Sequence, residues 1–362
     1  MGFVLDCQKF ISAISVPSRS SCFKIPLIGG REGETGRKHT GFVMAFTRLL
    51  VGLLGVLLPH HVTTGLNLRP IIGVLAQETD SSTYGDTYIP ATYIKYIESA
   101  GAQVVPIRVK EPEDYYEKLF NSINGVLFPG GGVDIITSEY AKAGKLLFLM
   151  AVQAHDKGDY FPVWGTCLGF QLLTAITTGQ DLLTKFDSTN VNWPLNFTQD
   201  AQKSHLLGSL PRDVHQYLSK ENVTENYHQY GMSPEIFNGN PALSKFYTVL
   251  STNMDRNGKV FISTMEAKKY PIFGTQWHPE KNLFQWNPKY DINHDAHAVR
   301  VSQYFASFLV SEARKSNHTF PSMKDEADAV IANYQPVYSN DGSFEQIYYF
   351  NYTRMGLKSL LP

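Results

Sequence analysis

From residue 70 onward, short apolar runs alternate with segments whose apolar residues recur at helical spacing. The apolar runs predict buried strands at 71–76, 104–109, 125–128 and 161–165. The helical spacing predicts helices at 90–101, 115–123, 138–158 and 168–177. Strands that alternate with helices of this length indicate βαβ units, so we expect an α/β fold. The natural topology is a three-layer α/β/α sandwich with a mostly parallel central sheet.

After residue 180 the alternation weakens. Strand-like segments follow, with the turn signal Asn257-Gly258 between the first two, at 246–253, 259–267 and 272–277. We expect them to form small antiparallel additions beside the main sheet. An amphipathic helix is predicted over 296–315. Because no repeat, low-complexity tract or linker interrupts this pattern, residues 66–362 are predicted to form a single domain.

The first 65 residues carry an apolar run of a different kind. Residues 49–58 (LLVGLLGVLL) contain no charge but are too few to span a bilayer. Basic residues precede the run and small residues follow it, which is the layout of a cleavable secretory signal; a buried helix is the alternative. Starting at Met44 gives a signal of ordinary length. We therefore expect residues 1–65 to be an upstream extension plus a signal peptide.

Asparagines in the N-glycosylation pattern support export. The pattern occurs at Asn196, Asn222, Asn317 and Asn351. Together with the signal they predict an exported glycoprotein of the secretory pathway. No membrane span is expected in the mature chain.

Composition excludes two broad classes. Hydrophobic residues make up 43% of the chain, which is enough for a packed core, so the chain as a whole is not disordered. The 32 basic and 33 acidic residues nearly cancel, and this balance argues against a nucleic-acid-binding protein. The 3 cysteines are too few for a disulfide scaffold.

Cys167 is the only cysteine of residues 66–362, and it lies in the sequence Gly165-Thr166-Cys167-Leu168-Gly169. An unpaired cysteine in an exported protein is either buried and inert or reactive. Here it follows a predicted strand and opens a predicted helix, the setting of a nucleophile elbow. The helix N-terminus favours the thiolate, and the N–H of Leu168 faces the place where an oxyanion would form. We therefore predict a nucleophile.

Two further segments fall at the ends of predicted strands. The run Gly130-Gly131-Gly132 follows the strand at 125–128 and offers backbone N–H groups to a ligand, although a plain tight turn would use the same residues. His278 and Glu280 lie two residues apart in QWHPE, so they point to the same side of an extended segment. Cysteine, histidine and carboxylate in that order suit acyl transfer.

Other ligand patterns are missing from the sequence. It has no HExxH, no paired CxxC and no dinucleotide fingerprint, so neither a metal nor a cofactor is predicted. His228, in Asn226-Tyr227-His228, is open to two interpretations: a loop histidine with satisfied hydrogen bonds or a ligand-binding residue.

The segments PGGGVD (129–134), WGTCLGFQLL (164–173) and TQWHPEKN (275–282) resemble the class I glutamine amidotransferase-like superfamily. Within it, residues 68–352 are similar to the gamma-glutamyl hydrolase family, which removes gamma-linked glutamates from folylpoly-gamma-glutamates. The resemblance implies a cysteine-peptidase mechanism with Cys167 as nucleophile, His278 as general acid/base and Glu280 as third member. An oxyanion hole at Gly131 and Leu168 fits the same site, with Gly130, Gly132 and His228 at the substrate.

The resemblance also implies a homodimer that acts in the lysosome or outside the cell, and it leaves several points open. Gln171 departs from the glutamate that some members carry four residues after the nucleophile. The cations for the substrate carboxylates are not determined, with Arg108, Lys281 and Arg300 as candidates. A glutaminase that supplies ammonia to a synthetase is the main alternative, since the same motifs serve both reactions. A catalytically inactive binding module is a third, and it would predict a disrupted triad.

Overall fold

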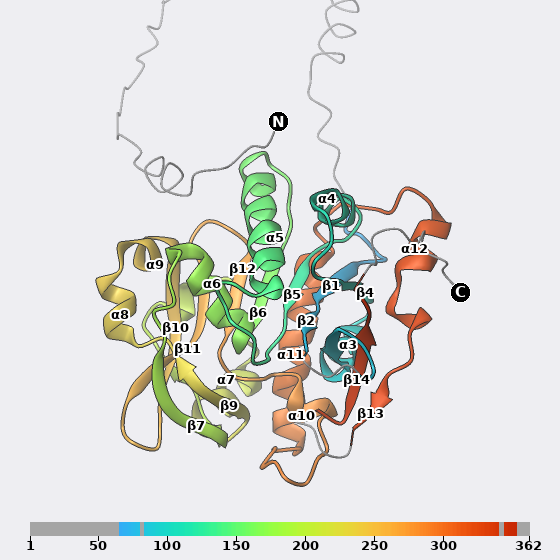
Figure 1. Cartoon of the computed structure of the whole chain (residues 1–362). Coiled ribbons are helices and arrows are strands. Elements are labelled where there is room, and N and C mark those ends of the chain that lie inside the picture. Colours follow the sequence, from blue (N-terminus) through green and yellow to red (C-terminus); the bar gives the residue numbers. More distant parts are fainter. Residues whose placement is uncertain (1–64, 80–82, 340–343, 353–362) are drawn as a thin grey trace, which may run out of the picture. The chain divides into compact units, whose positions relative to one another are not determined.

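The centre of the fold is a sheet whose middle strands run parallel (Figure 1). The computed structural model describes residues 65–79, 83–339 and 344–352. In these residues the parallel strands lie side by side in the order β4 (Gln103–Ile107), β1 (Ile71–Leu75), β5 (Val126–Phe128), β6 (Val163–Thr166) and β12 (Ile272–Thr275). The sheet continues beyond β12 with antiparallel strands, namely β11 (Val260–Ala267), β10 (Tyr247–Met254) and β8 (Asn196–Phe197). The segments 246–253 and 259–267 are thus antiparallel as expected, but the expectation for 272–277 was wrong, because β12 pairs parallel with β6.

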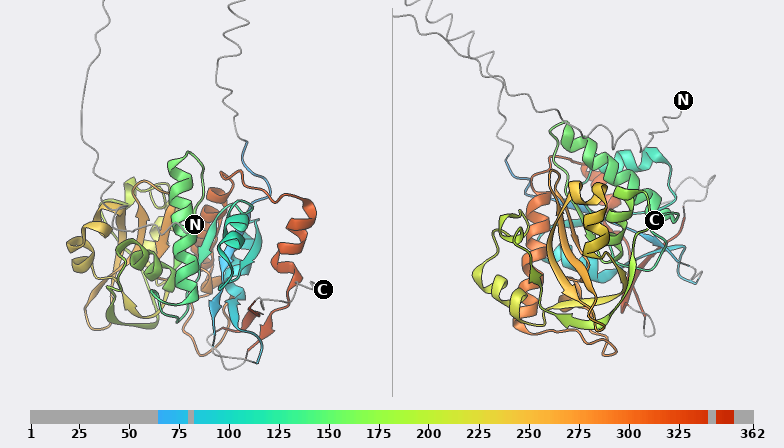
Figure 2. Two further views of the ribbon diagram at one scale, coloured as in Figure 1. Left: turned by 45° about the horizontal axis from the view of Figure 1, so that its top comes forward. Right: turned by 90° about the vertical axis from the view of Figure 1, so that its left-hand side faces the viewer.

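Successive residues of β1 show why helices cover both faces. Ile71 and Leu75 pack into one hydrophobic cluster, whereas Ile72 and Val74 pack into another. The first cluster is covered by α4 (Glu113–Phe120), α5 (Glu139–Asp156) and α6 (Leu168–Thr178). The second is covered by α3 (Ala91–Ser99), α7 (Arg212–Lys220) and α11 (Ala296–Ala313). Figure 2 shows strands between α11 and the helices α5 and α6. The predicted three-layer sandwich is confirmed.

The sequence pattern placed the main elements within a few residues of their observed ends. The helix expected at 138–158 spans Glu139–Asp156, because the Ser138 hydroxyl accepts from the N–H of Ala141 and caps it. The helix expected at 115–123 begins earlier, at Glu113, directly after Pro112. Gly258 has φ +79°, as the turn predicted at Asn257-Gly258 requires.

Two small sheets were not predicted. One contains β13 (Val337–Tyr338), β14 (Gln346–Phe350), β3 (Thr87–Pro90) and β2 (Gln77–Glu78). The other pairs β7 (Thr184–Trp193) with β9 (Thr224–Gly231). The remaining short elements are α8 (Pro234–Gly239), α9 (Pro241–Phe246), α10 (Lys281–Phe284), α12 (Met323–Ala329) and the 3₁₀ turns η1 (Ala201–Lys203) and η2 (Ile331–Asn333).

The described residues belong almost entirely to one compact unit that starts at Leu66. Among them, no helix combines the length and apolar character that crossing a membrane requires. The predicted extension and signal peptide lie outside the described residues, apart from Gly65.

Candidate active site

Cys167 lies in a strained turn between β6 and α6. Its backbone has φ 52° and ψ −104°, a conformation that residues with a side chain rarely adopt. The glycines on either side make the turn possible. A Cβ on Gly165 would lie 2.5 Å from the carbonyl oxygen of Gly169, and one on Gly169 would lie 2.0 Å from that of Phe128. The sequence GTCLG therefore folds into the elbow that its glycines predicted.

The register of the parallel strands gathers the candidate residues at one edge of the sheet. Thr275 of β12 pairs with Thr166 of β6, and the N–H of Cys167 donates to the Thr275 carbonyl over 2.8 Å. Cys167 thus lies beside the strand that leads to His278. Leu168 is the first residue of α6, where a backbone N–H has no acceptor within the helix.

His278 and Glu280 form a buried pair. The His278 Nδ1 lies 2.7 Å from Glu280 Oε1, and the relative exposure of the two residues is 3% and 0%. The backbone N–H of His278 donates to the Glu225 carbonyl of β9, which holds the ring-bearing segment in place. Because Nδ1 is turned to the carboxylate, Nε2 is the ring nitrogen left free to act on the Cys167 side chain, whose charge contributes to the ionisation of His278.

The charges around His278 favour the imidazolium. Burial opposes its charge, and so does Lys281, but Glu280 and Cys167 outweigh them and raise the pKa of His278 from 6.5 to about 10. At neutral pH the buried His278 ring therefore carries a proton that it can donate. A thiol, an imidazole and a carboxylate thus lie together, and groups of these three kinds can carry out an attack on a carbonyl group.

The glycine loop after β5 lies against both residues. A Cβ on Gly130 would lie 2.8 Å from His278 Cε1 and 3.2 Å from Cys167 Cβ, so only glycine fits between them. A Cβ on Gly131 would collide with the Gln77 side chain, whereas one on Gly132 would meet open space. The N–H of Gly130 is already used, since it donates to the Tyr93 hydroxyl over 2.8 Å. Among the described residues, the N–H groups of Gly131 and Gly132 have no protein acceptor.

Tyr93 is a member of the site that the sequence did not reveal. Its hydroxyl, on α3, lies 3.3 Å from His278 Nδ1 and accepts from Gly130. Burial raises the pKa of Tyr93 well above its usual range, and the charges of Glu280 and Cys167 add to this, so it remains a neutral phenol. In the sequence it is one apolar position of a helical stripe, indistinguishable from a core residue.

His228 lies near the pair but is not hydrogen-bonded to it. It is buried in β9, with Nδ1 3.0 Å from the Tyr230 carbonyl and Nε2 3.3 Å from Asn226 Oδ1. Burial is the main reason why the pKa of His228 falls to about 3, so the ring is neutral. The Nε2 of Gln171 donates to the same Tyr230 carbonyl over 2.7 Å. Gln171 therefore links the helix that follows Cys167 to the strand that carries His228.

The three candidate cations lie in different places. Lys281 is buried beside the site, 3.2 Å from the Glu225 carboxylate and over the Tyr227 ring. Arg108 follows the edge strand β4 and pairs with Glu111. Arg300 is half-exposed on α11 and pairs with Asp213 of α7. Of the three, only Lys281 is brought to the catalytic cluster.

The fold and this cluster define a class of protein: an α/β enzyme with a cysteine, a histidine and a carboxylate at the carboxyl ends of parallel strands, equipped for acyl transfer. The profile of the Peptidase C26 family matches residues 70–280, and the chain belongs to this family of cysteine peptidases.

Among similar proteins, the "Gamma-glutamyl hydrolase" of Homo sapiens is 45% identical over 323 residues, covering 85% of this chain and 100% of the relative. The protein of that name from Mus musculus is 45% identical over 319 residues, covering 85% of this chain and 100% of the relative. "Gamma-glutamyl hydrolase B" of Dictyostelium discoideum is 40% identical over 292 residues, covering 79% of this chain and 84% of the relative.

Proposed function

We propose that this protein is a cysteine-dependent hydrolase that cleaves the gamma-glutamyl bonds of folylpoly-gamma-glutamates. The observation that carries the proposal is the buried pair of His278 and Glu280 beside Cys167, in a chain that shares 45% identity with named gamma-glutamyl hydrolases. The glutaminase alternative uses the same groups, but the names of these relatives favour hydrolysis.

In the proposed reaction, the Cys167 thiolate attacks the gamma-carbonyl carbon and a C–S bond forms. The carbonyl oxygen becomes an oxyanion that accepts hydrogen bonds from the N–H groups of Leu168 and Gly131. His278 gives its proton to the leaving nitrogen as the C–N bond breaks, which leaves a thioester. Water then gives a proton to His278 and attacks the thioester; the C–S bond breaks and the thiolate returns. Glu280 holds the ring and stabilises its charge.

The other residues of the cluster take supporting roles in the proposal. Gly130 and Gly132 line the substrate, with Gly130 providing room rather than a hydrogen bond because its N–H is bound to Tyr93. His228 contacts the substrate as a neutral imidazole. The neutral Tyr93 hydroxyl keeps the glycine loop and the His278 ring at a fixed separation.

The test is a timed incubation of the purified protein with pteroylpentaglutamate, with products separated by chain length. We expect shorter pteroylglutamates and released glutamate or glutamyl peptides from the wild type and none from Cys167→Ala, with circular dichroism as the folding control. The pattern of products also distinguishes cleavage inside the chain from cleavage at its end. Ammonia released from glutamine, with the pentaglutamate left intact, would instead support the glutaminase.

We further propose that residues 1–65 are removed on export and that the mature glycoprotein acts in the lysosome or outside the cell as a homodimer. The asparagines of all four sequons are exposed, which supports their modification: Asn196, Asn222, Asn317 and Asn351. The test is the N-terminal sequence and native mass of the exported protein before and after deglycosylation. A mature N-terminus within residues 1–43, an unglycosylated product or a monomeric mass would contradict the corresponding part.

A further inference from the structure

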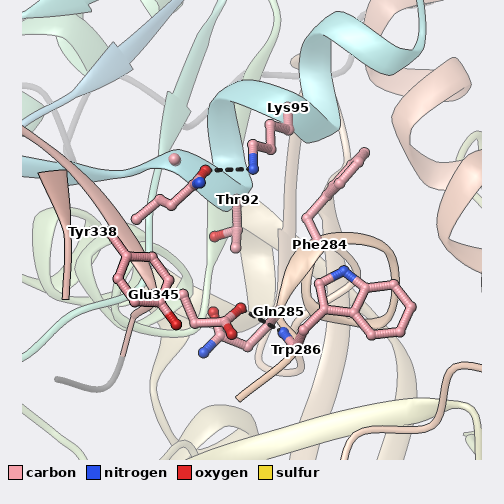
Figure 3. A pocket seen from close by; sticks show the side chains of 9 residues that line it. Thr92, Lys95, Phe284, Gln285, Trp286, Tyr338 and Glu345 are labelled. Carbon is pink, nitrogen blue, oxygen red and sulfur yellow. Dashed lines mark hydrogen bonds between the residues drawn. The ribbon is translucent and has the colours of Figure 1, made fainter. Parts of the chain in front are cut away.

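A pocket lies outside the catalytic cluster, between α3, the segment after α10 and the strands β13 and β14 (Figure 3). Its volume is about 190 Å³. Two parts of the chain that form its walls also carry residues of the candidate active site. Thr92 and Lys95 share α3 with Tyr93, and Trp286 follows α10, which begins directly after Glu280. The pocket is therefore built on the same part of the fold as the site.

One end of the pocket carries a basic side chain, and among the described residues this side chain has no partner of opposite charge. The half-buried Lys95 Nζ donates to Gln346 Oε1 over 2.5 Å, and it forms no ion pair within the part of the chain that the structure describes. Beside it, Thr92 is 5% exposed, and its hydroxyl has no hydrogen-bond partner among the described residues. A buried polar group without a partner costs free energy. A carboxylate placed here would accept from both Lys95 and Thr92.

Aromatic side chains flank the space next to this basic end. Trp286 and Tyr338 line the pocket with relative exposures of 63% and 61%. The Trp286 ring is stacked on His294, with ring centroids 3.9 Å apart and planes at 7°, so its orientation is fixed. Large exposed rings in a concavity are suited to packing against another planar ring.

The opposite end of the pocket is acidic. Figure 3 shows Glu345 and Lys95 on opposite sides of the space. The Glu345 carboxylate accepts from the backbone N–H of Trp286 over 2.6 Å. A carboxylate has room for further donors beyond this one. A ligand with an N–H group at this end would therefore also be matched.

Size and polarity together select the ligand. A cavity of about 150 Å³ accepts benzene, so this pocket accepts one ring with its substituents and not a larger ring system. We propose that it binds a 4-aminobenzoyl-glutamate unit, with the glutamate carboxylate at Lys95 and Thr92, the ring beside Trp286 and Tyr338, and the aryl N–H at Glu345. This assignment rests on the proposed function, because folylpoly-gamma-glutamates carry that unit. The pocket would then anchor the aryl end of the substrate.

The direct test is the binding of 4-aminobenzoyl-L-glutamate to the intact protein by titration calorimetry. This probe has no gamma-glutamyl bond and is not consumed. Lys95→Met removes a charged hydrogen-bond partner, so we expect the dissociation constant to rise about tenfold or more. The matched control is Lys118→Met, on the exposed surface of α4, which should bind like the wild type. Equal binding by Lys95→Met, or no binding by the wild type at millimolar probe, would overturn the proposal.

A kinetic test separates this inference from the proposed function. The substrates are 4-aminobenzoyl-penta-gamma-glutamate and a penta-gamma-glutamate without the ring. We expect Lys95→Met and Trp286→Ala to raise KM for the first about tenfold, and Trp286→Ala to leave kcat/KM for the second unchanged because that substrate lacks the ring. Hydrolysis of both with no effect of either variant would overturn the pocket alone. If the wild type hydrolyses neither, the proposed function fails, and the binding measurement still decides on the pocket.

Discussion

The pKa of His278 can be shifted up or down by substituting its charged neighbours. The Glu280 carboxylate, at 2.7 Å, raises the pKa of the ring, while burial and the buried Lys281 lower it, and the net result is about 10. A pKa raised from 6.5 to about 10 means that the reactive imidazolium persists at neutral pH and is lost as the pH rises through about 10. Removing either neighbour should move that upper limit in a predictable direction.

Glu280→Gln keeps the shape of the side chain but removes the charge that favours the imidazolium. We expect the basic limb of the pH profile of kcat/KM to move to lower pH. Each pKa unit corresponds to about 1.4 kcal/mol of interaction with the charged ring. Losing the carboxylate should also lower kcat/KM at pH 7 by about 10²- to 10⁴-fold, the range found for groups that orient and charge a catalytic histidine.

Lys281 provides the opposite perturbation. Truncating it alone would leave Glu225 buried without a partner, at a cost of about 3–5 kcal/mol, so the informative variant is Lys281→Met combined with Glu225→Gln. This pair removes the cation that opposes the imidazolium and keeps the site neutral overall. The basic limb should therefore move to higher pH.

The assay is kcat/KM on a gamma-glutamyl substrate from pH 4 to pH 11, with Lys142→Met as control because Lys142 is exposed on α5. Far-UV circular dichroism at each pH identifies points where a variant unfolds. If the basic limb of the Glu280→Gln profile stayed at the same pH or moved to higher pH, Glu280 would not be the group that raises the pKa of His278.

Three further predictions test other parts of the site. Cys167→Ala combined with His278→Ala should be scarcely slower than Cys167→Ala alone in single-turnover assays, because triad members act as a unit; additive losses would contradict the triad. Gly169→Ala should lower the free energy of unfolding in urea by about 1–3 kcal/mol or more, since its Cβ would lie 2.0 Å from the Phe128 carbonyl oxygen. Gly239→Ala, which meets no atom within 4 Å, should change little. The pKa of His228 is about 3 in the folded protein and 6.5 in the unfolded chain. As the pH falls below 6.5, His228 therefore binds a proton in the unfolded chain but not in the folded protein. Acidification to pH 5 should therefore remove about 2 kcal/mol of stability, a loss that His228→Gln should not show.

The parts of the site that the sequence predicted are those encoded locally. The elbow at Cys167 depends on two glycines within four residues, and the pairing of His278 with Glu280 depends on a two-residue spacing. The parallel sheet was predictable because strands buried on both faces are continuous apolar runs, as in β1. Tyr93 was missed because its role depends on the Gly130 loop, 37 residues away, which an apolar position in a helix does not reveal.

The strand β9 shows what a hydrophobic pattern cannot predict. Its residues Thr224, Glu225 and Asn226 are fully buried although all are polar, so the segment TENYHQYG resembles a loop in the sequence. Burial is possible because these polar side chains find partners, which for Thr224 and Glu225 come from distant parts of the chain. The Thr224 hydroxyl donates to the Trp193 carbonyl, and the Glu225 carboxylate faces Lys281. Such partners exist only in the folded protein.

The burial of Lys281 and Glu225 also bears on why this strand is polar. Apolar residues of similar size would give a buried contact at least as stable as an ion pair, so stability alone does not account for the pair. Its position does: the Glu225 carbonyl accepts from the N–H of His278, and the Lys281 charge acts on both His278 and His228. The Lys281–Glu225 pair therefore holds the strand that carries His228 against the segment that carries His278, and it determines the charge that both rings experience. If Lys281→Met with Glu225→Gln left both the pH profile and the substrate KM unchanged, this role would be wrong and the pair would be structural only.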